Sequence, residues 1–66
     1  MTNPETIVDY AYPCMMAENA LRKAHQAMLA KSYDEAIELT EIATAECRLM
    51  AVSIRHMKEQ ENALRK

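Results

Sequence analysis

The stretch Lys31-Ser32-Tyr33-Asp34-Glu35-Ala36-Ile37-Glu38 decides the fold, because it marks the junction between two helical segments. Glu35 follows Ser32 by three residues, which is the spacing of a capping box. In such a box the Ser32 hydroxyl accepts the amide hydrogen of Glu35, and the Glu35 carboxylate accepts that of Ser32. The carboxylates of Asp34 and Glu38 suit the positive end of a helix dipole. The sequence therefore predicts that a helix begins at about residue 33.

The helix predicted over residues 33–64 is long and apolar around most of its girth. Two heptad registers form its expected seam, and their members are Tyr33, Thr40, Cys47, Ile54 and Glu61 in one and Ala36, Ala43, Met50, Met57 and Leu64 in the other. Other apolar residues lie off that seam, namely Leu39, Ile42, Leu49 and Val52. A helix with this pattern must be buried on more than one side, so we expect a homo-oligomer.

A second helix is predicted over residues 13–30, before the junction. Its apolar stripe has alternating spacings of three and four and consists of Cys14, Ala17, Leu21, Ala24 and Met28, widened by Ala20 and Ala27. If the chain reverses near Lys31-Ser32, Met28 should face Ala36 and Ala24 should face Thr40. A short helical segment is expected at about residues 4–11, ended by Pro13.

The composition agrees with an all-α fold in which residues 1–66 form a single hairpin domain. The chain has 66 residues, a net charge of −2 and no Gly, so tight β-turns that need positive φ are disfavoured. A core of this size stabilises a fold by only a few kcal/mol, so assembly into an oligomeric helical bundle is expected. The charge disfavours bulk nucleic-acid binding, and no apolar run is long enough for a membrane span. The two cysteines suit the cytoplasm.

No constellation predicts an enzyme, a metal site or a cofactor. Cys14 and Cys47 both fall on the expected seam, where small buried side chains are the favoured interpretation and a redox pair is the alternative. His25 and His56 lack the Glu-x-x-His spacing of di-iron bundles, so surface histidines are expected. The carboxylates after Ser32 resemble a solvated helix start and not an acid–base pair.

A ligand site for an anionic nucleotide is the sharper hypothesis. Its candidate residues are Tyr10, Tyr12, Arg48, Arg55 and His56. The tyrosine rings can stack on a base, and arginine can bind phosphate through two parallel hydrogen bonds. These rings are expected to lie against residues 54–57 of the long helix. The alternative is that the basic residues only complement the negative end of that helix.

Two resemblances bear on function. Residues 17–44, with Tyr33-Asp34-Glu35-Ala36-Ile37-Glu38 at their centre, resemble one tetratricopeptide-like helix–turn–helix. Most of the chain is a glycine-free hairpin whose long second helix carries Arg48-Leu49-Met50 and Ser53-Ile54-Arg55-His56-Met57-Lys58. In this it resembles small proteins that bacteriophages encode, among them helical-hairpin anti-defence sponges. That resemblance implies a homo-oligomer that sequesters a nucleotide signal in the host cytoplasm. The alternative is a protein–protein interaction module that docks on a host or partner protein, for which methionines offer an adaptable surface.

Overall fold

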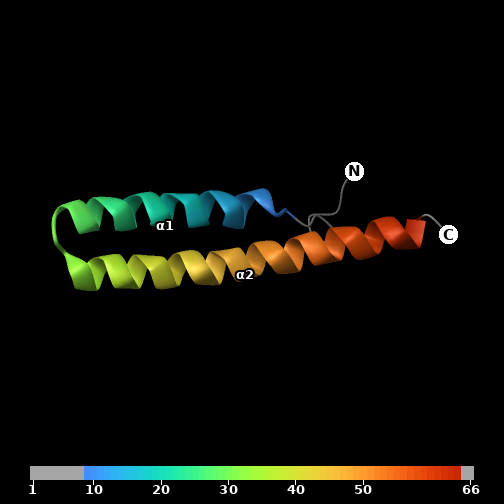
Figure 1. Ribbon diagram of the computed structural model, residues 1–66. Coiled ribbons are helices and arrows are strands. Elements are labelled where there is room, and N and C mark those ends of the chain that lie inside the picture. The colour runs from blue at the N-terminus through green and yellow to red at the C-terminus, as the bar shows by residue number, and fades with distance from the viewer. Residues whose placement is uncertain (1–8, 65–66) are drawn as a thin grey trace.

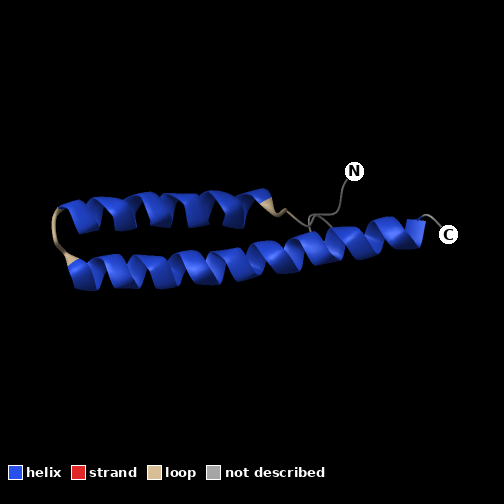
Figure 2. Ribbon diagram, viewed as in Figure 1, coloured by secondary structure: helices blue, strands red, loops and turns tan. Residues whose placement is uncertain are grey.

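The computed structural model describes residues 9–64, which form two helices joined by a tight turn. Helix α1 spans Ala11–Leu29 and helix α2 spans Tyr33–Leu64, and no strand occurs between residues 9 and 64. The helices lie side by side and run antiparallel (Figures 1 and 2). Because α1 has 19 residues and α2 has 32, α2 extends past the first turn of α1. The predicted all-α hairpin is therefore confirmed.

The turn is built by the main chain and not by the predicted capping box. Lys31 has a φ of 61°, the left-handed conformation that Gly adopts at lowest cost. Its amide donates to the Met28 carbonyl oxygen at 2.9 Å, and the Ser32 amide donates to that of Ala27 at 2.8 Å. This pair of bonds is a Schellman motif. Within residues 9–64, no side-chain hydrogen bond joins Ser32 to Glu35, so that part of the prediction is corrected.

The start of α1 differs from the predicted boundary at residue 13. Asp9 and Tyr10 are not helical, and residues 4–8 of the short segment expected at 4–11 lie outside the described residues. Tyr10 is the N-cap residue and makes no side-chain capping bond, whereas the preceding Asp9 carboxylate accepts a hydrogen bond of 2.9 Å from the Ala11 amide. Pro13 lies inside this turn, where its missing N–H has no intrahelical partner to lose. Pro13 therefore belongs to α1 and does not terminate a separate helix.

Alanine dominates the contact between the helices. The buried apolar residues keep 4–7% of their surface exposed, and they are Ala17, Ala20, Ala24 and Ala27 of α1 and Ala36 and Ala43 of α2. On α2 the half-buried residues Leu39, Glu46, Met50 and Ser53 continue this line. Their alternating spacings of three and four form one heptad seam. The hairpin is therefore closed by small side chains.

This seam corrects the predicted one. The expected register of Ala36, Ala43 and Met50 does face α1, but Tyr33 and Ile54 are 56% and 46% exposed. On α1, Leu21 is 52% exposed, although it was expected in the stripe. The physical reason is size, because two helix backbones approach most closely where both present alanine. The larger apolar side chains are left along the margins of the contact, with Tyr33, Ile37 and Ile54 on one side of α2 and Ile42 and Leu49 on the other.

Neither α1 nor α2 is long and apolar enough to cross a membrane, as judged on residues 9–64.

Candidate functional site

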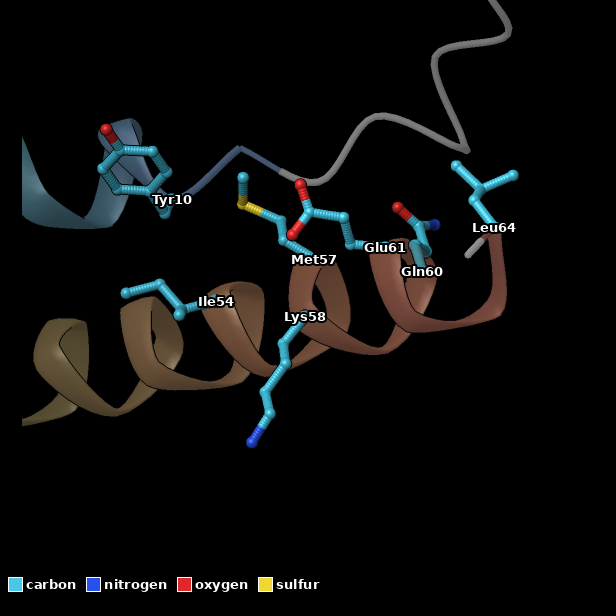
Figure 3. Close-up of a pocket in the computed structure, with 7 residues that line it drawn as sticks. All are labelled: Tyr10, Ile54, Met57, Lys58, Gln60, Glu61 and Leu64. Carbon is cyan, nitrogen blue, oxygen red and sulfur yellow. The ribbon is translucent and has the colours of Figure 1, made fainter. Parts of the chain in front are cut away.

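A groove lies where α2 extends past the beginning of α1, and we call it the end groove. Its volume is about 530 Å³, and its lining residues are Tyr10, Ile54, Met57, Lys58, Gln60, Glu61 and Leu64. Tyr10 contributes from the residue before α1, whereas the others lie on the last three turns of α2 (Figure 3). Met57 is directed toward the α1 side of this groove, whereas the Lys58 ammonium points away from it (Figure 3). The end groove thus has an aromatic and apolar lining near Tyr10.

Only part of the predicted ligand site comes together in one chain. Tyr10 lies with Ile54 and Met57, as expected. Tyr12 is 62% exposed and does not line the end groove, and neither do the predicted cations Arg48, Arg55 and His56.

Helix geometry explains the separation of those cations. Arg48 and Arg55 are seven residues apart and share one face of α2, whereas His56 is rotated by about 100° from Arg55. All three side chains are exposed. Lys58 is the cation that lines the end groove, and the sequence interpretation assigned it no role in the site. The sequence feature that could have predicted this position is the spacing of four residues between Ile54 and Lys58, which places both on one face of α2.

A second groove lies near the turn, and we call it the turn groove. Its volume is about 260 Å³, and its lining residues are Ala24, His25, Met28, Tyr33, Ala36, Ile37 and Thr40. The predicted neighbours Met28 and Ala36, and Ala24 and Thr40, do line it together. The turn groove shows that the exposed apolar margins of α1 and α2 lie on the same side of the hairpin.

We call that side the open face. Its residues are all exposed, and they are Leu21 and Met28 of α1 and Tyr33, Ile37, Thr40, Thr44, Cys47, Ala51 and Ile54 of α2. The large members keep 46–56% of their surface exposed. Spacings of three and four continue from Tyr33 to Ile54, so this stripe follows α2 for about 32 Å. It is an apolar surface that residues 9–64 do not cover.

The hydroxyl groups of the two threonines at the middle of the open face each donate a hydrogen bond to the main chain of the same helix. Thr40 donates from Oγ1 to the Ile37 carbonyl oxygen at 2.7 Å, and Thr44 donates to the Thr40 carbonyl oxygen at 2.9 Å. Hydroxyls bonded to the preceding turn can be removed from water at little further cost, because their donors are already paired. The centre of the open face is therefore small and suited to burial.

The two cysteines are free thiols. Cys14 is half-buried and Cys47 is exposed on the open face, so the expectation that both are buried is corrected for Cys47. No group of three or more His, Cys, Asp or Glu side chains that could hold a metal ion occurs within the described part of the chain.

One carboxylate lies in the contact between the helices. Glu46 is half-buried in the seam of α2, and its Oε1 atom is buried without a hydrogen-bond partner. A buried polar atom without a partner loses hydration and gains nothing in exchange. Glu46 is therefore a cost to the hairpin and not an evident ligand site.

Comparison with known proteins adds no relative. No protein-family model matches the chain, and no curated protein and no solved structure matches it.

Proposed function

We propose that this chain is a non-enzymatic, homo-oligomeric binding protein. The observation that supports the proposal is the open face, which leaves Tyr33, Ile37 and Ile54 about half exposed in one continuous stripe. Contiguous apolar surfaces of this kind are rare on monomers and are typical of interaction sites. The occupant we propose is a second copy of this chain, which would present the same stripe.

The composition of the hairpin core supports the same proposal. Apart from Pro13, the buried residues of the described chain are alanines, which transfer little apolar area from water. The largest apolar side chains are instead exposed, among them Leu21 and Tyr33. Burying them between subunits adds the hydrophobic stabilisation that a chain of 66 residues lacks on its own. A reducing cytoplasm suits this assembly, because Cys47 on the open face is a free thiol.

Sedimentation equilibrium between about 1 and 100 μM tests the assembly. Ile37→Asp should shift the protein toward monomer, because it places a charge in the open face. Ile42→Asp is the matched control, since Ile42 has a similar exposure of 48% on the opposite flank of α2. It should leave the oligomer intact. A wild-type protein that is a folded monomer across this range would contradict the proposal.

A second candidate function is sequestration of an anionic nucleotide-like ligand, as in the phage sponges that the chain resembles. The observation that favours it is the end groove, where the Tyr10 ring lies with Ile54 and Met57 and Lys58 is at the margin. An aromatic and apolar wall suits a stacked base.

A thermal-shift and calorimetric screen with cyclic dinucleotides tests this second function. A ligand that binds should raise the melting temperature, and Tyr10→Ala should remove that rise. Tyr12→Ala is the matched control, because Tyr12 lies outside the end groove. Equal binding by the wild type and Tyr10→Ala would exclude the end groove. If no nucleotide binds and a pull-down yields one dominant protein partner, the protein-interaction module is the better description.

A further inference from the structure

We propose that α2 pairs with α2 of a second copy in antiparallel orientation, centred between Ala45 and Glu46. This inference rests on the proposed homo-oligomer and specifies its geometry. The pairing seam is the part of the open face on α2, extended by one turn, and its members are Tyr33, Ile37, Thr40, Thr44, Cys47, Ala51, Ile54 and Lys58. Their spacings alternate between four and three, which is the a/d pattern of a two-stranded coiled coil.

When the two helices pair about this centre, seam residues of similar size face each other. Ile37 meets Ile54 of the partner subunit, and Thr44 meets Cys47 of the partner subunit. Thr40 meets the partner's Ala51, so the middle layers consist of small side chains. At each end Tyr33 meets Lys58 of the partner subunit, where an ammonium can lie against an aromatic ring. Large side chains thus face each other near the ends and small ones face each other at the centre.

The charges beside the seam are self-complementary in the same arrangement. Asp34, Glu41, Arg48 and Arg55 follow one another at intervals of seven, on the margin of the seam away from α1, and all are exposed. In antiparallel coiled coils, residues at this flanking position pair with the same position of the partner. Asp34 then meets the partner's Arg55, and Glu41 meets the partner's Arg48. Because a two-fold axis relates the two subunits, each of these ion pairs occurs twice in the dimer.

Within α2, Glu41 and Arg48 have no oppositely charged residue three or four positions away. Side chains meet on one helix when they are three or four residues apart, so neither residue can form an ion pair within α2. Both residues line one shallow surface hollow with Thr44 and Ala45, on either side of the proposed centre.

Other registers bring like charges together. Sliding the partner by one heptad in one direction places Glu41 against Glu41 and keeps only two attractive pairs, between Asp34 and Arg48. Sliding it in the other direction places Arg48 against Arg48 and keeps only two, between Glu41 and Arg55. A parallel pair would place Lys58 against Lys58 and gather the acidic ends of both helices. Juxtaposed like charges suppress such pairings. The charge pattern therefore favours one register and one orientation.

The turn groove provides a hole for the partner. Four of its residues, Tyr33, Ala36, Ile37 and Thr40, have the spacing i, i+3, i+4 and i+7. Four residues with this spacing form the hole into which a side chain from a facing helix inserts. In the proposed register the inserted side chain is Ile54 of the partner subunit.

Charge exchange tests the register. Glu41→Arg and Arg48→Glu should each weaken the dimer about tenfold or more in sedimentation equilibrium at low salt, because each change places two like-charged pairs across the interface. The double variant Glu41→Arg/Arg48→Glu should recover the wild-type dissociation constant within about threefold, since the attractive pairs re-form. Glu38→Arg changes the net charge equally outside the seam and its flanking stripe, and it should have no effect. Circular dichroism confirms that each variant is helical.

Pulsed electron paramagnetic resonance tests the orientation. A nitroxide at Glu59→Cys, in a Cys14→Ser/Cys47→Ser background, should give a distance of about 40 Å between subunits, from a rise of about 1.5 Å per residue. A parallel pair would bring the two labels within about 15 Å, since helices in contact are about 10 Å apart.

The outcomes separate this inference from the proposed function. A dimer with a short label distance, or one without recovery in the double variant, overturns the antiparallel pairing and leaves the homo-oligomer standing. A wild-type protein that remains a folded monomer overturns both.

Discussion

The Ser32 amide reaches back five residues to donate to the Ala27 carbonyl oxygen at 2.8 Å. This bond closes the turn around Lys31, whose φ of 61° lies in the left-handed region. A side chain with a Cβ is strained there, and the sequence offers no Gly to relieve the strain. The hairpin therefore holds an unfavourable residue at the position on which its reversal depends.

Lys31→Gly should stabilise the fold by about 0.5–1 kcal/mol, because Gly adopts positive φ without strain. Urea denaturation at a fixed protein concentration measures the change. Lys23→Gly is the matched control inside α1, and it should cost about 1 kcal/mol through lost helix propensity. Equal destabilisation by both variants would show that the turn does not need a left-handed residue.

Ala43→Leu should open the contact between the helices. Ala43 is 4% exposed, and the added side chain has no room between backbones that alanines hold close. Overpacking of this kind costs about 1–3 kcal/mol. Ala45→Leu makes the same change at an exposed position of α2 and should stay within about 0.5 kcal/mol of the wild type. Thermal unfolding of the two variants makes the comparison.

Glu46→Met should raise the free energy of unfolding by about 1–2 kcal/mol, because it removes a buried carboxylate oxygen that has no partner. Met fills an irregular gap without a polar atom. The control is Glu38→Met, an exposed position where the same exchange should change stability little. Loss of stability in Glu46→Met would indicate that Glu46 forms an interaction in the oligomer.

The thiols should be dispensable. A Cys14→Ser/Cys47→Ser variant is expected to keep the oligomeric state and any ligand or partner binding of the wild type, because both cysteines are free. Sedimentation equilibrium and the same binding assay check this. Loss of binding with unchanged helicity would assign chemistry to a thiol and overturn the non-enzymatic interpretation.

The helices and their reversal could be predicted because they follow from local rules. Apolar residues at spacings of three and four predicted both helices, and the junction near Lys31-Ser32 predicted where the chain turns. The exact seam could not be predicted in the same way. Hydrophobicity ranks Leu21 and Met28 above alanine, whereas the close approach of two helices favours the smaller side chain.

The candidate site was only partly predictable for the same reason. Tyr10 lines the end groove with Ile54 and Met57, because it directly precedes α1 and α2 extends past that end of α1. The positions of Arg48 and Arg55 depended on the rotation of α2 about its axis. The observed seam is rotated about the α2 axis by a fraction of a turn from the expected seam. Both guanidinium groups therefore lie at the margin of the open face and not in the expected site.

The alanine contact between the helices also affects how readily α1 closes onto α2 during folding. Alanine has no rotamers to lose on burial, so closing α1 onto α2 costs no side-chain entropy at those positions. The described helices pack against each other around a single chain reversal, and helical topologies of this kind fold in microseconds to milliseconds. The association of two chains is instead a second-order step, so its rate decreases when the protein is diluted. In the proposed dimer, dilution therefore slows the meeting of two chains but not the closing of α1 onto α2 within each chain.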